Sequence, residues 1–281
     1  MTSTHNFLQA LTDFYVQNAR TMPWRLPCDD GRYDPYRILV SEIMLQQTGV
    51  SRVTPKFEQF LQRFPTIHAL ADASLAEVLP IWSGLGYNRR AQYLLEAAQK
   101  LADVAEPWLY ENLVSLKGIS HNTAAAIIVY SYDRPMIFVE TNIRTVMIYH
   151  FFRNHTAVHD TDILDKLAQV VPWNTQKQTP LHSPRQFYYA MMDYGTYLKS
   201  THGNVSKQSK GYVKQSVFLG SRRQIRGHVI AKLVNGPMQI KDLQSSLNDP
   251  RLFGVLDSLE REKMVTIQGT FVMLYNKTHK T

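Results

Sequence analysis

Apolar residues recur at helical spacing through the first two thirds of the chain. The segment YRILVSEIMLQQT follows Asp34 and Pro35 and runs apolar until Gly49. An aspartate before a proline is typical of a helix start, because the aspartate caps a free N–H group and the proline has none to lose. We therefore predict a helix that carries Glu42 and is stopped at Gly49.

More helices follow this first one. Ser74 and Glu77 have the spacing of a capping box and start a short helix, SGLGY breaks it, and NRRAQYLLEAAQKLADV resumes with apolar residues three and four apart. Further helices are predicted near 108–114, over 122–132 and from about 141 to 152. No alternating strand pattern interrupts the series, so this part of the chain is predicted to be all-α.

The pattern changes towards the C-terminus. SRRQIRGHVIAKLVNG, MQIKDLQSSL and RLFGVLDSLEREKM each predict a helix, and the runs MVTIQ and TFVMLY, separated by Gly269, predict a hairpin. Three helices and a hairpin are typical of a winged-helix module. Because its third helix carries Asp257, Glu260 and Glu262, the module could contact DNA or serve protein packing.

Composition adds a polyanionic partner to this picture. The chain has 281 residues, 44% of them apolar, with a net charge of +8, enough for two or three compact units. No acidic residue lies between Asp193 and Asp242. Among the basic residues in this gap are Lys199, Lys207, Lys210, Lys214, Arg222, Arg223, Arg226 and Lys232. Such a run usually follows a phosphate backbone, and the alternative is a solvated face or linker.

Cysteine usage and hydropathy exclude several classes of protein. Cys28 is the one cysteine, which excludes an internal disulfide and a multi-cysteine metal site. His155 and His159 lack partners with metal-ligand spacing, so we interpret them as surface residues. No signal peptide or apolar run of membrane-spanning length is apparent. We expect a cytoplasmic, bacterial-type protein, nucleoid-associated and monomeric, with no membrane contact and no metal.

The turn LKGIS, at 116–120, is the most informative local feature. Gly118 favours a left-handed turn directly before a helix, and such a turn aims unpaired backbone N–H groups at one point in space. A phosphate is the anion that best fills that point. Nucleic acid is therefore the first partner to consider.

Several motifs occur together with this turn, in the order of a known family. They are PWR at 23–25, PYRILVSEIMLQQT at 35–48, GLGYNRRA at 84–91, FVETNIRTV at 138–146 and MMDYG at 191–195. Over roughly residues 20 to 200, the chain resembles the helix-hairpin-helix DNA glycosylases, most closely the MutY-type adenine DNA glycosylases. The resemblance implies a two-lobed helical fold, with a six-helix domain that contains the hairpin at 21–132 and a second helical domain from 1–20 and 133–215. The winged-helix module predicted from the C-terminal pattern occupies 216–281.

The resemblance also implies a pair of catalytic carboxylates. Release of a purine passes through a sugar cation, so it needs a proton donor at the base and a carboxylate near the cation. Glu42, held protonated by apolar neighbours, would be the donor; an ordinary surface glutamate is the alternative. Glu140 stands where the family carries an aspartate, near a helix start whose dipole favours the ionised form. Asn142 would orient that carboxylate, although asparagine is also a common cap.

Other positions imply how the enzyme would handle the nucleotide. Asn122 replaces the lysine that bifunctional relatives use to attack the sugar, so the chain resembles the monofunctional enzymes. Gln47 and Tyr87 match residues that fill the gap left by a flipped-out nucleotide. Arg25 would lie at the adenine pocket, with Leu45 and Thr48 in the base-pocket and intercalation group. The expected phosphate contacts are Gly118, Ser120, Lys199, Lys207 and Lys210, with Ser120 in place of the second glycine of the hairpin and able to cap the next helix.

Two departures from the family change these expectations. The four cysteines that hold an iron–sulfur cluster would fall near Lys199, Ser206, Ser209 and Gln215, none of which binds iron. We therefore expect a clusterless relative without a cofactor, in which packing and hydrogen bonds hold this loop. A winged helix also replaces the C-terminal MutT-like domain, so the opposite base is not predicted.

The sequence thus predicts a monofunctional base-excision-repair glycosylase that hydrolyses the glycosidic bond of a flipped-out, mispaired adenine in duplex DNA. One alternative keeps this fold and mechanism but removes another base, such as thymine, uracil or a modified purine. The other is a non-catalytic DNA-binding relic of a glycosylase.

Overall fold

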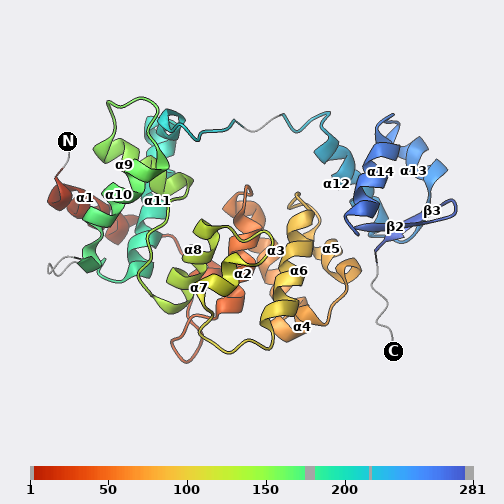
Figure 1. The fold of residues 1–281 in the computed structure, drawn as a ribbon, viewed down its shortest axis with the longest axis horizontal. Helices are drawn as coiled ribbons and strands as arrows, with labels where there is room; N and C mark the ends of the chain where they lie inside the picture. Colours follow the sequence, from red (N-terminus) through yellow and green to blue (C-terminus); the bar gives the residue numbers. More distant parts are fainter. Residues whose placement is uncertain (1–2, 175–180, 215–216, 276–281) are drawn as a thin grey trace. The chain divides into compact units, whose positions relative to one another are not determined.

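The computed structural model describes residues 3–174, 181–214 and 217–275. The chain forms two compact units. The first contains Met1–Ile38, Pro107–Val114 and Ile119–Lys214, and the second contains Leu39–Glu106, Ser115–Gly118 and Gln215–Thr281. The described residues are mostly helical, which confirms the expected fold class (Figure 1).

The first unit is a group of helices packed around α11 (Pro184–His202). Helices α9 (Thr141–Phe151) and α1 (Thr4–Asn18) pack against it. Aromatic and aliphatic side chains fill this core, among them the fully buried Phe7, Leu11 and Phe187. The unit also contains α7 (Tyr110–Val114), α8 (His121–Tyr132), α10 (Asp160–Val170) and the 3-10 turns η1 (Pro23–Arg25), η2 (Pro172–Asn174) and η3 (Val205–Gln208).

Helix α8 is the most deeply buried helix of this unit. Its residues 123–131 are all buried, which explains why the sequence here is apolar on every side. Arg185 lies at its C-terminal end and donates to the carbonyl oxygens of Tyr130 at 2.7 Å and Ser131 at 3.1 Å. These carbonyls have no partner within the helix, so the arginine satisfies them and its charge opposes the negative end of the helix dipole.

The second unit is built first from α3 (Val50–Arg63), α4 (Ile67–Ala71), α5 (Leu75–Trp82) and α6 (Arg89–Leu101). The predicted capping box of Ser74 and Glu77 is present at the start of α5. Helix α3 was not predicted, because Pro55 inside it interrupts the pattern of helix-forming residues.

Helix α2 (Pro35–Leu45) begins in the first unit and continues into the second. Asp34 caps it as predicted, since its Oδ1 accepts a hydrogen bond from the Tyr36 N–H at 2.8 Å. The predicted stop at Gly49 was wrong, because α2 ends at Leu45 and the backbone turns left-handed at Gln47. This early end places Gln47 beyond the helix.

The C-terminal part of the second unit has the winged-helix order of elements. Helices α12 (Arg222–Leu233), α13 (Ile240–Leu247) and α14 (Leu252–Arg261) precede the predicted hairpin of β2 (Val265–Gln268) and β3 (Phe271–Leu274). A third strand, β1 (Met238–Gln239), was predicted as the start of a helix, but it pairs antiparallel with β3 through Met238 and Val272. The sheet order is β1-β3-β2.

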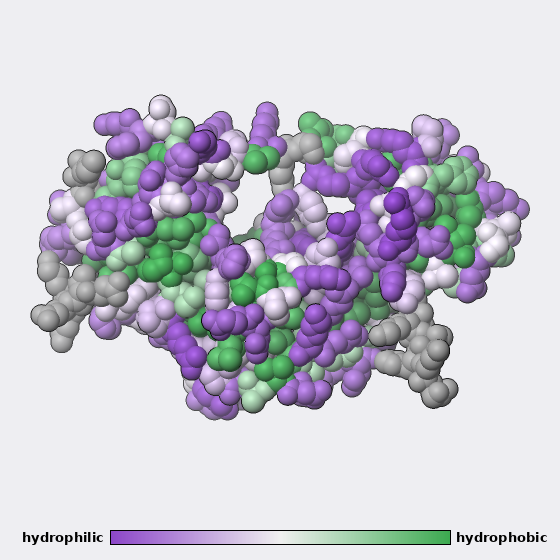
Figure 2. Space-filling model, in the orientation of Figure 1, coloured by the Kyte–Doolittle hydropathy of each residue, from purple (hydrophilic) through white to green (hydrophobic). Residues whose placement is uncertain are grey.

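Hydrophilic residues predominate on the face shown in Figure 2, and apolar residues form separate patches. No helix in the described ranges is both long and apolar enough to cross a membrane.

Candidate active site

Glu140 lies in the first unit, directly before α9. The residue before it, Val139, is hydrogen-bonded through its backbone to the side chain of Asn122. Glu140 is the N-cap residue of α9 and is half-buried. The Asn122 side chain binds both backbone groups of the preceding residue, donating from Nδ2 to the Val139 carbonyl at 2.8 Å and accepting from the Val139 N–H at 3.5 Å. The amide at position 122 therefore fixes the peptide that leads into the Glu140 carboxyl group.

Burial controls the charge of Glu140. Desolvation raises the pKa of this carboxyl group above its ordinary value, and Arg144, one helical turn further along, opposes the rise only in part. The start of the helix favours the ionised form, as expected from the dipole, while burial acts in the opposite direction. Helix dipoles contribute a partial charge, whereas removal from water acts on the full charge.

Asn142 follows Glu140 in the first turn of α9 and faces α11. Its Nδ2 lies 4.0 Å from Met192 Sδ. A Cβ atom placed on Gly195 would lie 2.4 Å from the Asn142 carbonyl oxygen. The glycine of the MMDYG motif therefore allows α11 to lie directly against the start of the helix that carries Glu140 and Asn142.

In the second unit, Glu42 lies on α2 next to the loop that follows it. Glu42 is half-buried, and its chain neighbours Ile43 and Met44 are buried. Leu45 ends the helix and Thr48 is half-buried behind the exposed Gln47. Gln47 has a positive φ of 56°, which is uncommon for a residue other than glycine and occurs often at functional sites.

Tyr87 lies on a second loop with the same backbone conformation. Its φ is 49°, its side chain is exposed, and Gly86 before it also has a positive φ. Arg90, which the sequence interpretation missed, is buried among the backbone carbonyls of both loops. The arginine pair in GLGYNRRA was a signal, but which of the two points inward depends on the start of α6.

The predicted turn before α8 has the expected geometry at both of its ends. Gly118 has a φ of 80°, and a Cβ atom there would lie 2.5 Å from the Tyr93 ring, which confirms that this position requires glycine. Gln46 Nε2 donates to the Gly118 carbonyl at 3.0 Å. The Ser120 side chain accepts from the Thr123 N–H at 3.2 Å, which confirms its predicted role as a cap.

The basic run contains both exposed and paired side chains. Lys199, Lys207 and Lys210 are exposed in the first unit. Arg226 instead binds Glu262 at 2.5 Å. Burial disfavours the Glu262 charge, but hydrogen bonds from Arg226 and Arg89 outweigh it and lower the pKa of Glu262 to about 2. The fold thus brings an acidic residue, Glu262, next to the part of the chain that contains no acidic residue of its own.

Hydrogen bonds hold the loop where the family carries its cluster. Ser206 and Ser209 are buried, and the Val158 backbone bonds to the Gln208 carbonyl and the Lys210 N–H, both at 2.9 Å. These residues do not fit an iron–sulfur cluster, because hydroxyl groups replace the thiolates that iron needs. Within the described residues, no group of three or more histidine, cysteine or acidic side chains could hold a metal ion. Gln215 lies outside the described residues.

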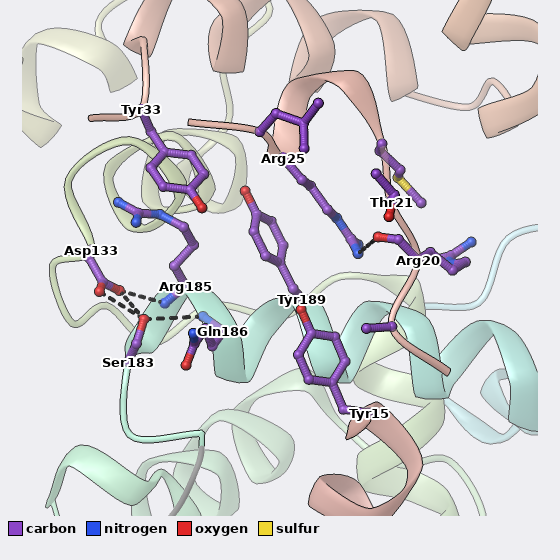
Figure 3. Close-up of a pocket in the computed structure, with 13 residues that line it drawn as sticks. Tyr15, Arg20, Thr21, Arg25, Tyr33, Asp133, Ser183, Arg185, Gln186 and Tyr189 are labelled. Atoms are coloured by element: carbon purple, nitrogen blue, oxygen red, sulfur yellow. Dashed lines mark hydrogen bonds between the residues drawn. The ribbon is translucent and has the colours of Figure 1, made fainter. Parts of the chain in front are cut away.

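Arg25 lies in a pocket of about 380 Å³ in the first unit (Figure 3). Its guanidinium group binds the fully buried Asp193 carboxylate at 2.9 and 3.0 Å and lies 4.3 Å above the centre of the Tyr189 ring. Arg185 lies in the same pocket, 3.7 Å above the ring of Tyr33. Arg25 therefore has a structural partner, and its contact with a base stays a prediction.

The fold, the turn and the carboxylate segment are those of a class of DNA repair proteins. Residues 40–172 match the HhH-GPD superfamily of base excision DNA repair proteins. Among solved structures, the chain is similar to a thermostable thymine-DNA glycosylase, with a TM-score of 0.58 and 20% identity over 73% of this chain and 91% of that one. An endonuclease III in a DNA complex has a TM-score of 0.55, with 15% identity over 74% of this chain and 92% of that one. These two likenesses concern the fold.

Sequence relatives narrow this class. The adenine DNA glycosylase of Mycolicibacterium smegmatis is 32% identical over 94% of this chain and 94% of its own length. That of Buchnera aphidicola subsp. Baizongia pistaciae is 30% identical over 80% of this chain, and the match spans 64% of that relative. The chain belongs to the adenine DNA glycosylases of the HhH-GPD superfamily.

Proposed function

We propose that this protein is a monofunctional DNA N-glycosylase that hydrolyses the bond between a mispaired adenine and its sugar. The observation that carries the proposal is the 32% identity to an adenine DNA glycosylase over 94% of both chains. The substrate is duplex DNA with a mispair or lesion, bound by a monomer through the turn at Gly118 and Ser120 and through the exposed lysines 199, 207 and 210. No iron–sulfur cluster takes part.

Two carboxyl groups divide the chemistry. Glu42, with buried apolar neighbours on α2, donates a proton to the leaving adenine, because a neutral leaving group lowers the barrier to cleavage. Glu140 provides the negative charge that stabilises the sugar cation, and it does so only when ionised. Burial raises the pKa of Glu140, and the positive charge of the transition state acts in the opposite direction and favours its ionisation.

Asn122 supports the monofunctional assignment. An amide cannot form a Schiff base with the sugar, and this one binds both backbone groups of Val139. We propose that it positions Glu140, and that Asn142 orients the same carboxylate from within α9. Gln47 and Tyr87 enter the duplex as the nucleotide leaves it. Arg25, Leu45 and Thr48 complete the base pocket and intercalation group.

Single-turnover kinetics test the proposal. The substrates are duplexes with adenine opposite guanine or oxidised guanine, and matched duplexes with thymine or uracil mispairs. We expect release of adenine alone. Faster release of thymine or uracil would support the same fold acting on another base, and no release from any duplex, despite tight binding, would support the non-catalytic alternative.

Glu42→Gln tests the proton donor in the same assay. This change removes the acid and keeps the shape, so base release should fall by at least about 10²-fold, the usual range for loss of a general acid. The affinity for the duplex should stay within about threefold of the wild-type value, because a half-buried amide of the same shape replaces the carboxyl group without new steric contact. Unchanged release by this variant would contradict the assignment of Glu42.

A further inference from the structure

Arg90 lies in the first turn of α6 and joins the two loops that carry Gln47 and Tyr87. Only 7% of its surface is exposed. Its Nη1 donates to the carbonyl oxygens of Ile43 and Met44, both at 2.9 Å, and of Gln46 at 2.6 Å. These carbonyls lie at the C-terminal end of α2, where helical carbonyls lack partners within the helix.

The other terminal nitrogen of Arg90 binds both loops. Nη2 donates to the carbonyl oxygens of Leu85 at 3.3 Å and Gly86 at 3.1 Å in the second loop, and to Thr48 Oγ1 at 3.0 Å in the first. One planar guanidinium group thus joins the two loops. Its fork is rigid, so the distance between the two sets of carbonyls is fixed by the group itself.

The bonds fall directly before the two left-handed residues. Gln46 precedes Gln47 (φ 56°), and Gly86 precedes Tyr87 (φ 49°). A left-handed residue other than glycine costs of order 1 kcal/mol and persists only where the surroundings hold it. By bonding the carbonyl on the N-terminal side of each such residue, Arg90 restrains the peptide planes from which both side chains extend.

The groups that surround the Arg90 guanidinium offset part of the cost of burying its charge. Its hydrogen-bond partners among the described residues are carbonyl oxygens and one hydroxyl group, while burial lowers its pKa to about 10. The negative end of the α2 dipole faces the guanidinium group and offsets part of its desolvation. The buried guanidinium group therefore requires the carbonyl groups of both loops, and the loops in turn require its hydrogen bonds.

We propose that Arg90 is a positioning residue that holds Gln47 and Tyr87 as a single two-pronged wedge, so that both enter the duplex together when the nucleotide is extruded. The inference rests on the proposed function for its substrate. A lysine keeps the charge but has one nitrogen with three N–H donors, too few for the six acceptors that the two terminal nitrogens of Arg90 reach. Arg90→Lys therefore separates the link between the loops from the charge.

Extrusion can be measured without bond cleavage, which tests Arg90 separately from the proposed function. The probe is a duplex with 2-aminopurine, an adenine analogue that is dim when stacked and bright when extruded, placed opposite guanine. At saturating protein, Arg90→Lys should reduce the fluorescence gain by roughly tenfold to 10²-fold, the loss that accompanies a misplacement of about 1 Å. A gain equal to that of the wild type would overturn the inference alone, whereas no gain with either protein would contradict base extrusion itself and overturn the proposed function together with the inference.

Base release gives a second measurement, a ratio of rate constants that does not change when part of the protein is unfolded. The ratio of single-turnover rate constants for a paired adenine and for the same adenine in a one-nucleotide bulge is independent of the folded fraction. Arg90→Lys should lower this ratio by about tenfold, because the bulged base is already unstacked. Equal losses on both substrates would reduce Arg90 to a general role in stability and overturn the inference.

Two further variants complete the experiment. Arg89→Lys is the matched control, because Arg89 is in the same turn, is about half exposed and pairs with Glu262; the paired-to-bulged ratio should not change. If Arg90→Lys does not fold, Trp82→Phe removes one N–H donor to the Gly86 carbonyl, now 3.2 Å away, and should lower the same ratio by about threefold. An unchanged ratio for Trp82→Phe would then overturn the inference.

Discussion

Asn122 shows how one side chain sets the chemistry available to its neighbour. It uses both its donor and its acceptor on the Val139 backbone, so the next residue, Glu140, enters α9 from a fixed peptide. A lysine at this position would offer no acceptor to the Val139 N–H group, and it would place a positively charged amine near the carboxylate. The same position that excludes Schiff-base chemistry therefore also supports the carboxylate that a hydrolytic mechanism needs.

The raised pKa of Glu140 gives a testable dependence of stability on pH. Its pKa in the folded protein lies above the ordinary value of 4.5, so its contribution to stability is fully present below that value and is lost as pH rises through the folded pKa. Relative to Glu140→Gln, the wild type should lose unfolding free energy between about pH 4 and about pH 8, by about 1.4 kcal/mol per unit of pKa change. Urea unfolding at the two pH values measures this difference.

Glu77→Gln provides a control of opposite sign. The Ser74 N–H and hydroxyl groups lower the pKa of Glu77, so its contribution is present above the unfolded pKa and is lost as pH falls. The two variants should therefore change the pH dependence of unfolding in opposite directions. A wild-type protein that gained stability from Glu140 as pH rose would show that its carboxylate is stabilised in the folded state.

At the scale of elements, the position of the start of α9, which carries Glu140 and Asn142, depends on how closely α9 and α11 approach. Gly195 contributes no side chain, and the Asn142 backbone occupies the space where its Cβ would be. Helices approach this closely only where one of them carries a small residue at the contact. The glycine of the MMDYG motif therefore affects the position of Glu140 through packing, because Glu140 lies two residues before Asn142 in the chain.

Gly195→Ala should separate these helices. The added Cβ would lie 2.4 Å from a backbone oxygen, so the helices must shift, and we expect a loss of about 1–3 kcal/mol of unfolding free energy. Base release should fall further than the stability loss explains, because Asn142 moves with the start of α9. The measurements are urea unfolding and single-turnover kinetics on the same preparation.

Gly227→Ala is the matched control for this change. Gly227 lies inside α12, and apart from its chain neighbours and the backbone of its own helix, no atom of the described residues lies within 4 Å of a Cβ placed there. Alanine is the better helix former, so this variant should be more stable by about 0.5–1 kcal/mol. Equal effects at the two glycines would show that the helix approach at Gly195 is not restrictive.

At the scale of the whole molecule, charge is distributed so that some basic side chains are available and others are used internally. Arg226 and Arg89 bind Glu262 within the second unit, while Lys199, Lys207 and Lys210 are exposed in the first. Among the described residues, these three lysines form no ion pair, so a phosphate backbone can contact them without breaking one. Their contribution should depend on salt, because each phosphate contact releases a bound counterion.

Replacement of Lys199, Lys207 and Lys210 by glutamine should weaken binding to every duplex and flatten its salt dependence. Each lost phosphate contact lowers the slope of log affinity against log salt by about 0.9. Fluorescence anisotropy with mispaired and fully paired duplexes over a range of salt concentrations measures the slope. Lys100→Gln, at the far end of α6 from Arg90, should leave it unchanged, and a triple variant with the wild-type slope would exclude these lysines from the DNA-binding surface.

The sequence by itself determined the features that follow from local physics. The caps at Asp34, Ser74 and Ser120, the left-handed Gly118 and the final hairpin depend on side chains a few residues apart, so residue type and spacing predict them. The helical class and the ordered motifs were also readable, because apolar periodicity and motif order are properties of the chain. Residues 40–172 matched the expected superfamily for the same reason.

Tertiary structure alone decided the features that depend on groups distant in the sequence. The early end of α2 and the strand β1 depend on partners in other segments, Arg90 and β3, which override local preference. Arg25 pairs with Asp193, and burial raises the Glu140 pKa, although no local pattern indicates either. Desolvation and long-range hydrogen bonds depend on which groups the fold brings together, and these interactions act on both the pKa of Glu140 and the two loops of the proposed wedge.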